Sequence, residues 1–307
     1  MVDTREQNSV RIGVVQMSCG PDPEQNRQRA AAEIESAASQ GASIVCLPEL
    51  FSSVYPCQTE DRSGFEFAES IPGPTTELLS KVAAARQVSV IGSVFERRAA
   101  GIYHNTAVVI DPTGQLVGVY RKMHIPDDPL YHEKFYFTPG DLGFRSHTVP
   151  GARLGVLVCW DQWFPEAARL TALDGAQILF YPTAIGWQFD EGAEQDAAQH
   201  DAWETIQRSH AIANGVFVVA ANRVGFEATP GDESAATASG GIRFWGQSFV
   251  SDPFGRVLSC ASSEEPETSV VECDLTAIER VRQEWPFLRD RRVDAYADLS
   301  RRFRDSD

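Results

Sequence analysis

Three polar residues follow apolar, strand-like segments of the sequence, at the places where those segments end. Glu49 comes after residues 43–47, Lys122 after residues 116–120, and Cys159 at the end of residues 154–159. Because ligand sites in open α/β sheets form at the carboxyl ends of strands, these side chains could converge on one site. A carboxylate, an amine and a thiol together could support nucleophilic attack on a carbonyl-type carbon.

The thiol of Cys159 can attack such a carbon only as the thiolate, so it needs a neighbouring base. Glu49 could accept its proton. Lys122 could donate a hydrogen bond to the oxyanion that the attack creates, together with the backbone N–H of Trp160. Pro165 can begin the next helix, whose positive end would then lie near Cys159 and favour an anionic sulfur. These residues are therefore candidates for a nucleophile, its base and its oxyanion donors.

Each of these residues also has a purely structural interpretation. A cysteine after Gly-Val-Leu-Val is more often a buried apolar side chain than a nucleophile. Glu49 alone fits a charge or ion pair at a strand end, and Lys122 beside Arg121 fits a solvated surface. Because 73 residues separate Glu49 from Lys122 and 37 separate Lys122 from Cys159, spacing does not decide between the two interpretations.

Apolar segments of strand length alternate with longer helical patterns along the 307 residues. Helices are expected over residues 24–39, 75–86, 165–173 and 197–214, and strands over 10–17, 88–95, 178–181 and 216–221. Two similar DPxG turns, at 111–114 and 252–255, predict two hairpins, and residues 231–241 predict a surface loop. This alternation predicts an α/β layered sandwich. No linker or change of composition divides the chain, so we expect a single domain over residues 1–307.

The composition limits the possible partners and cofactors. A net charge of −16 argues against binding nucleic acid or an anionic membrane, and no apolar segment is long enough to span a bilayer. The sequence has no GxGxxG, P-loop, HExxH or GxSxG motif, so neither a metal nor an organic cofactor is expected. There is no secretory signal, and the six scattered cysteines suit reduced thiols, so we expect a cytoplasmic protein.

Three segments together resemble the signature motifs of the nitrilase superfamily of carbon–nitrogen hydrolases, and they come in the order found in that family. They are LPEL at 47–50, YRKMHIP at 120–126 and VCWD at 158–161. The resemblance implies a four-layer α-β-β-α sandwich whose helices pack against a second copy, giving αββα–αββα dimers or larger homo-oligomers. It implies that Glu49 is the general base, Lys122 the oxyanion stabiliser and Cys159 the nucleophile. Glu133 matches a second family glutamate, which holds the lysine.

Further segments resemble the branch of this family that acts on N-carbamoylputrescine. They are residues 127–144, 159–170, 179–187, 200–218 and 285–296. The resemblance implies a small cationic ureido substrate. A covalent cysteine intermediate would convert it to putrescine, carbon dioxide and ammonia, in the synthesis of putrescine from agmatine.

Several residues are expected to contact this substrate. Trp160 would do so through its backbone N–H, Tyr55 and Trp187 would form apolar walls, and His132 lies beside Glu133 in the sequence. The distal ammonium needs acceptors, for which the candidates are Asp128, Asp190, Glu191 and Glu194. Around Gln188 the chain departs from plant-type members, which tend to place a glutamate soon after the glycine matching Gly186.

Related substrates are the nearest alternative: N-carbamoyl-β-alanine, N-carbamoyl amino acids or aliphatic amides. A substrate carboxylate would require an arginine at the distal end of the site. Arg223 could be that residue, or it could belong to a structural ion pair. A second alternative is a catalytically inactive oligomeric scaffold, which the intact Glu49, Lys122 and Cys159 disfavour.

Overall fold

Two six-stranded sheets lie at the centre of the computed structural model, which describes residues 8–188, 193–230 and 240–304. The first sheet has the order β15 (Glu267–Asp274), β1 (Ser9–Gln16), β2 (Ile44–Cys46), β3 (Ser89–Ala99), β4 (Ile102–Ile110) and β5 (Leu116–Arg121). The second has the order β14 (Val257–Cys260), β13 (Phe249–Ser251), β10 (Phe217–Ala221), β8 (Ile178–Pro182), β7 (Ala152–Val156) and β6 (Ser146–Val149).

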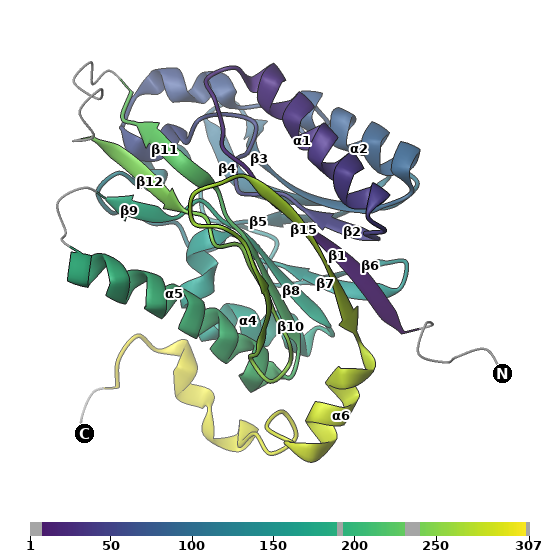
Figure 1. Cartoon of the computed structure of the whole chain (residues 1–307). Coiled ribbons are helices and arrows are strands. Elements are labelled where there is room, and N and C mark those ends of the chain that lie inside the picture. The colour runs from purple at the N-terminus through teal and green to yellow at the C-terminus, as the bar shows by residue number, and fades with distance from the viewer. Residues whose placement is uncertain (1–7, 189–192, 231–239, 305–307) are drawn as a thin grey trace.

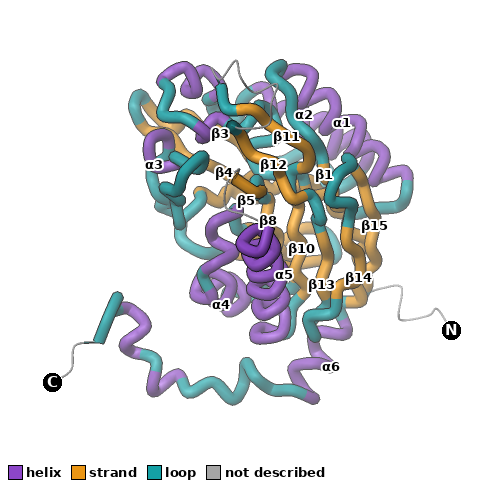
Figure 2. The backbone as a smooth tube through the Cα atoms, turned by 60° about the vertical axis from the view of Figure 1, so that its left-hand side comes forward, coloured by secondary structure: helices purple, strands orange, loops and turns teal. Residues whose placement is uncertain are grey.

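Helices cover the outer face of each sheet. Helices α1 (Pro23–Ser39) and α2 (Pro74–Arg86) pack on the first sheet, and α4 (Pro165–Leu173) and α5 (Ala193–Asn214) pack on the second (Figures 1 and 2). The sheets face each other through buried side chains such as Ile12, Ile44, Val156 and Phe180. The structure therefore confirms the four-layer α-β-β-α sandwich.

The two hairpins at the DPxG turns are confirmed, and they occupy related places in the two sheets. β4 and β5 follow β3 in the first sheet, as β13 and β14 follow β10 in the second. In each turn the aspartate N–H donates to the carbonyl four residues later at 2.9 Å, and Gly114 and Gly255 have φ of 84° and 75°. A side chain is strained at such φ values, which explains the glycine at both positions.

The structure also contains elements that the sequence did not predict. Strands β9 (Gly186–Gln188), β11 (Val224–Ala228) and β12 (Gly241–Trp245) form a separate three-stranded sheet, and α3 (Glu133–Tyr136) lies within a segment expected to be a loop. These elements have only three to five residues, too few for a periodic pattern to show. Residues 231–239 of the predicted surface loop lie outside the described residues.

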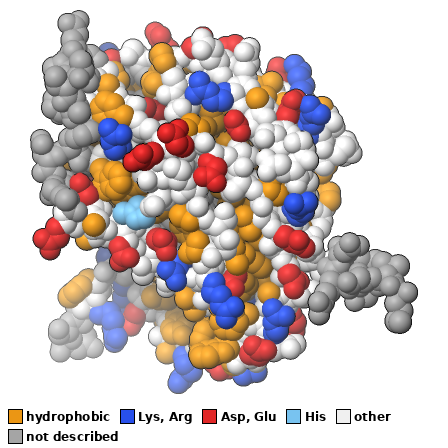
Figure 3. All heavy atoms as spheres, in the orientation of Figure 1, with side chains coloured by type: hydrophobic (Ala, Val, Ile, Leu, Met, Phe, Trp, Pro, Cys, Tyr) orange, Lys and Arg blue, Asp and Glu red, His pale blue; other side chains and the backbone are white. Residues whose placement is uncertain are grey.

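The C-terminal segment follows α6 (Thr276–Glu284) and runs past α4 and α5 (Figure 2). A cavity of about 610 Å³ lies between these helices and this segment, lined among others by Leu170, Leu173, Tyr296 and Leu299. Hydrophobic side chains also gather on the lower part of the face shown in Figure 3. No helix within the described ranges has both the length and the apolar character that a membrane span requires.

Candidate active site

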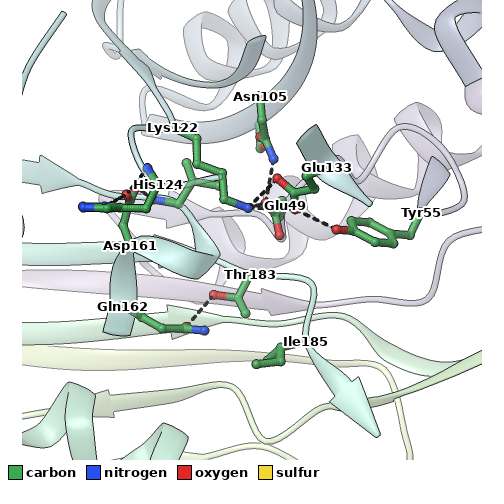
Figure 4. A network of polar contacts seen from close by, with 12 residues as sticks. Glu49, Tyr55, Asn105, Lys122, His124, Glu133, Asp161, Gln162, Thr183 and Ile185 are labelled. Carbon is green, nitrogen blue, oxygen red and sulfur yellow. Dashed lines mark hydrogen bonds and ion pairs between the residues drawn. The ribbon is translucent and has the colours of Figure 1, made fainter. Parts of the chain in front are cut away.

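Glu49, Lys122 and Glu133 meet in the interior of the protein, although they come from distant parts of the sequence. Glu49 follows β2, Lys122 follows β5, and Glu133 begins α3. Lys122 Nζ donates to Glu49 Oε1 at 2.8 Å and to both carboxylate oxygens of Glu133 at 2.8 Å (Figure 4). Side-chain exposure is 0% for Lys122 and Glu49 and 1% for Glu133. The structure thus brings these residues together, while their catalytic roles stay a prediction.

The carboxylate of Glu49 is held at one oxygen and open at the other. Its Oε1 accepts from Lys122 and from Asn105 Nδ2 at 2.7 Å, whereas Oε2 has no hydrogen-bond partner among the described residues. The backbone at this turn is fixed by Arg223, which donates to the carbonyls of Glu49 and Leu50 at 3.1 and 2.6 Å. One oxygen of a rigidly held carboxylate is therefore available to accept a proton.

Cys159 lies at the start of a short 3-10 helix (Cys159–Trp163), three residues after the end of β7. Its sulfur accepts a hydrogen bond from the backbone N–H of Ala184. Burial raises the pKa of this thiol well above its ordinary value. The Glu49 carboxylate raises the pKa further, and the Lys122 ammonium only partly opposes the shift. The charges of Glu49 and Lys122 therefore both act on the sulfur.

The raised pKa changes one expectation about Cys159. Helix α4 begins at Pro165 as predicted, and we expected its dipole to favour an anionic sulfur. Instead, residues 159–163 form a turn between the sulfur and α4, and burial keeps the thiol protonated in the resting state. A sulfur that acts as a nucleophile in this position would have to lose its proton as it attacks, and it would need a base beside it.

The charges of Lys122 and Glu133 depend on each other. Burial by itself lowers the pKa of Lys122, but the Glu133 and Glu49 carboxylates outweigh it, and the pKa lies well above its ordinary value. Burial raises the pKa of Glu133 to about 7 although Lys122 opposes this, and the hydroxyl of Tyr55 donates to its Oε1 at 2.6 Å. The site therefore retains a cation beside the cysteine.

A cavity of about 380 Å³ is lined by Trp160, which follows Cys159 in the sequence, and by Ile185, which follows Ala184. The lining residues are Asp128, Pro129, Tyr131, Trp160, Trp163, Ile185, Gly186, Gln199, Ala202 and Trp245. Among these described residues Asp128 is the only carboxylate, and there is no lysine, arginine or histidine. A small molecule with an apolar body and a cationic end would fit this lining.

Two of the six predicted substrate contacts, Trp160 and Asp128, line this cavity, and three others lie elsewhere. Tyr55 is fully buried behind Glu133, where its hydroxyl is needed as a donor, and does not form a cavity wall. Trp187 donates from Nε1 to the Asp196 carbonyl at 3.1 Å and packs against Trp245. The backbone N–H of His132 donates to the Cys57 carbonyl at 2.8 Å, and no part of His132 lines the cavity.

Three other acidic residues were predicted as acceptors for the substrate ammonium, and none is found among the described residues of the cavity lining. Glu191 and Asp190 lie outside the described residues, so their prediction stays open. Glu194 is exposed in the first turn of α5 and does not line the cavity.

Arg223 is a structural residue in this fold. Its guanidinium is fully buried and donates to the Glu49, Leu50 and Ser53 carbonyls and to Glu227 Oε1 at 2.6–3.1 Å. Each of its three nitrogens already has a partner. The prediction that Arg223 could bind a substrate carboxylate is therefore not supported, whereas its alternative role in an ion pair is.

Sequence reasoning missed several residues of the site. Asn105 in β4 holds Glu49, and the cavity wall includes Tyr131, Trp163 and Trp245. Asn105 had a detectable signal, since it is an amide at the start of a buried apolar strand segment. Trp245 had none, because β12 comes from a distant segment. Within the described residues there is no group of three or more histidine, cysteine or acidic side chains placed to hold a metal ion.

Comparisons with known proteins identify the family of this chain. The model of the family described as "Carbon-nitrogen hydrolase" matches residues 11–283. The chain is 39% identical to an N-carbamoylputrescine amidase of Oryza sativa subsp. japonica, over 95% of each chain. It is 36% identical to a citrullinase of Francisella tularensis, covering 96% of this chain and 99% of the relative.

Two solved structures extend the comparison. A carbon-nitrogen hydrolase from Helicobacter pylori G27 superposes with a TM-score of 0.91 at 46% identity, covering 96% of this chain and all of the other. A glutamate-to-glutamine mutant of an amidase from Nesterenkonia sp. AN1 superposes with a TM-score of 0.72 at 25% identity, covering 93% and 94%. In that mutant the acetamide moiety of fluoroacetamide is covalently added at the active-site cysteine.

Proposed function

Because the chain belongs to the carbon–nitrogen hydrolase family, we propose that it hydrolyses N-carbamoylputrescine to putrescine, carbon dioxide and ammonia, with Cys159 as the nucleophile. The cavity lined by Trp160, the residue after Cys159, carries this proposal, because the described residues of its lining combine aromatic rings with a single carboxylate and no cationic side chain. Ureido compounds that end in an amine suit such a lining better than compounds that end in an acid.

In the proposed first step, the Cys159 sulfur attacks the ureido carbon while Glu49 Oε2 accepts the thiol proton. The open Oε2 atom supports this role. The oxyanion would receive hydrogen bonds from Lys122 Nζ and the Trp160 N–H. The C–N bond to the terminal nitrogen then breaks, and Glu49 returns the proton so that ammonia leaves. A thiocarbamate on Cys159 remains.

In the second step, water takes the place of ammonia. Glu49 accepts a proton from the water, whose oxygen attacks the thiocarbamate carbon, and the C–S bond breaks with return of the proton to sulfur. The released carbamate loses carbon dioxide to give putrescine. The covalent adduct described for the amidase from Nesterenkonia supports a cysteine nucleophile. In this reaction Glu133 would hold Lys122 in place through its two hydrogen bonds.

The distal ammonium would lie near Asp128, between aromatic rings of the cavity. Tyr131, Trp160, Trp163 and Trp245 present faces that attract a cation. A substrate carboxylate would instead be placed beside Asp128 without a compensating charge among the described lining residues, which costs free energy. This argument favours N-carbamoylputrescine over N-carbamoyl-β-alanine and over citrulline, the substrate implied by the name of the relative from Francisella.

Ammonia release from N-carbamoylputrescine, N-carbamoyl-β-alanine and citrulline, measured in parallel, tests the substrate. We expect the highest kcat/KM for N-carbamoylputrescine. Asp128→Asn should raise its KM roughly fivefold, from the loss of about 1 kcal/mol for a partly exposed ion pair. Asp127→Asn is the matched control, because its neighbouring carboxylate is exposed and does not line the cavity. A higher kcat/KM for either acid would overturn the assignment.

We also propose that the chain forms a single domain. Two copies of this domain would associate through α4 and α5. Leu170 and Leu173 on α4 are each 48% exposed, beside the cavity under the C-terminal segment. Light scattering should give a dimer or a larger assembly for the wild type and a monomer for the Leu170→Asp/Leu173→Asp variant. A monomeric wild type would contradict this.

All six cysteines are free thiols, which supports the proposal that the protein acts in the cytoplasm.

A further inference from the structure

Asp161 joins the two chain segments that carry Cys159 and Lys122. Its carboxylate is fully buried, and each of its oxygens accepts two hydrogen bonds. Oδ2 accepts from the Val158 N–H at 2.9 Å and from the Tyr120 hydroxyl at 2.7 Å. Oδ1 accepts from the N–H of His124 at 3.1 Å and from its Nδ1 at 2.7 Å (Figure 4). Val158 immediately precedes the cysteine, while Tyr120 and His124 flank the lysine.

The turn at Cys159 requires such support. Cys159 has a φ of 41°, in the left-handed region that side chains other than glycine rarely adopt. A residue in this conformation persists only when its surroundings hold it. Asp161 closes the turn twice, because its N–H donates to the Val158 carbonyl at 3.0 Å and its carboxylate accepts from the Val158 N–H.

The two side chains that donate to Asp161 each carry a proton that they can donate. Burial and the neighbouring Asp161 raise the pKa of Tyr120 well above its ordinary value, so the hydroxyl keeps the proton that it donates. The ring of His124 stacks on Phe164, with centroids 3.7 Å apart and planes 4° from parallel. Because a carboxylate can only accept, Nδ1 of His124 carries the ring proton in this contact.

We propose that Asp161 is a positioning residue that sets the place of the Cys159 sulfur relative to Lys122, with His124 as its donor from the lysine segment. The inference rests on the proposed roles of Cys159 and Lys122, and it assigns Asp161 no contact with substrate. Loss of the His124 donor would leave the two segments free to shift against each other. A shift of about 1 Å between reacting groups lowers a rate by roughly a hundredfold.

Two variants of His124 that are similar in size separate positioning from packing. His124→Asn keeps an amide donor close to the position of Nδ1, whereas His124→Leu has no donor, and both lose the stacked ring. We expect kcat for N-carbamoylputrescine to fall roughly a hundredfold in His124→Leu and at most about threefold in His124→Asn. KM should stay within about twofold in both, because His124 does not line the cavity.

Changes at Asp161 and Tyr120 complete the test. Asp161→Asn should lower kcat as His124→Leu does, and Tyr120→Phe should lower it by a smaller factor, since one donor to Asp161 is lost. The control is Asp111→Asn, a carboxylate that accepts three hydrogen bonds in a hairpin turn remote from the site, and kcat should not change. If Asp161→Asn does not fold, the comparison of His124→Leu with His124→Asn still tests the positioning role.

The outcomes separate this inference from the proposed function. Equal kcat in His124→Leu and His124→Asn would overturn the positioning role, even with the wild type fully active. Labelling of Cys159 by fluoroacetamide, detected by mass spectrometry, reports the reactivity of the sulfur without the proposed substrate. A wild type that is labelled and active, with slower labelling in His124→Leu than in His124→Asn, supports the inference. A wild type that is neither labelled nor active would overturn both proposals.

Discussion

Replacement of Lys122 by methionine tests the charge balance of the site most severely. The lysine is fully buried and donates three hydrogen bonds of 2.8 Å to Glu49 and Glu133. Lys122→Met leaves two carboxylates in the interior without their cation. Removal of one partner of a buried ion pair costs about 3–5 kcal/mol of folding free energy, so we expect a loss of this size at alkaline pH.

The loss should depend on pH in a definite direction. In the wild type, burial raises the pKa of Glu133 to about 7 while Lys122 opposes the shift. Without the lysine, the hydrogen bond from Tyr55 still lowers the Glu133 pKa but the main opposition to burial and to the Glu49 charge is lost, so this pKa rises further. An acid whose folded pKa is raised destabilises the protein as the pH rises from its unfolded pKa to its folded pKa. The difference between variant and wild type should therefore shrink between pH 9 and pH 7, by about 1.4 kcal/mol for each unit between the two pKa values.

Urea denaturation of both proteins at pH 7 and pH 9 measures this difference. Lys134→Met is the matched control, because Lys134 is exposed on the same short helix as Glu133, and its free energy of unfolding should change by less than about 0.5 kcal/mol. Equal stability of Lys122→Met and the wild type at both pH values would refute the buried charge cluster. A difference that grows toward pH 7 would refute the sign of the Glu133 shift.

Three further predictions concern single side chains. Cys159→Ala should abolish ammonia release with little change in melting temperature, and residual turnover near the wild-type rate would exclude the sulfur as nucleophile. The free energy of unfolding of the wild type should fall by about 3 kcal/mol between pH 4.5 and pH 7, because the Glu133 pKa rises from 4.5 to about 7, and Glu133→Gln should remove this fall in urea titrations. Arg223→Met should cost about 3–5 kcal/mol in urea denaturation because it leaves Glu227 buried without its partner, and a smaller loss in a Glu227→Gln background would show their coupling.

Local patterns predicted the elements that carry their own start and stop signals. Helix α4 runs over Pro165–Leu173 as expected, because proline suits its first turn and Gly175, with a φ of 97°, follows its end. The DPxG turns were readable for the same reason. The strand ends at Glu49 and Lys122 followed from buried apolar segments that stop at a polar residue.

Features that depend on distant partners could not be read in this way. Strand β15 pairs with β1 in antiparallel register, Ser9 opposite Asp274, and no local pattern reports that pairing. Glu133 lies in a segment without periodicity, so only the family resemblance pointed to it. The burial of Tyr55 behind Glu133 and of Arg223 under the Glu49 turn depends on side chains that meet only after folding.

Labelling by fluoroacetamide tests the central claim most directly. Attack by the Cys159 sulfur would displace fluoride and leave one acetamide group on that residue. Cys260 is an exposed thiol of the same chain and serves as an internal control. We predict a single acetamide group on Cys159 by peptide mass spectrometry, none on Cys260, and slower labelling in the presence of N-carbamoylputrescine. Labelling of Cys260 in place of Cys159, or labelling of Cys159 at a rate that N-carbamoylputrescine does not change, would contradict the account.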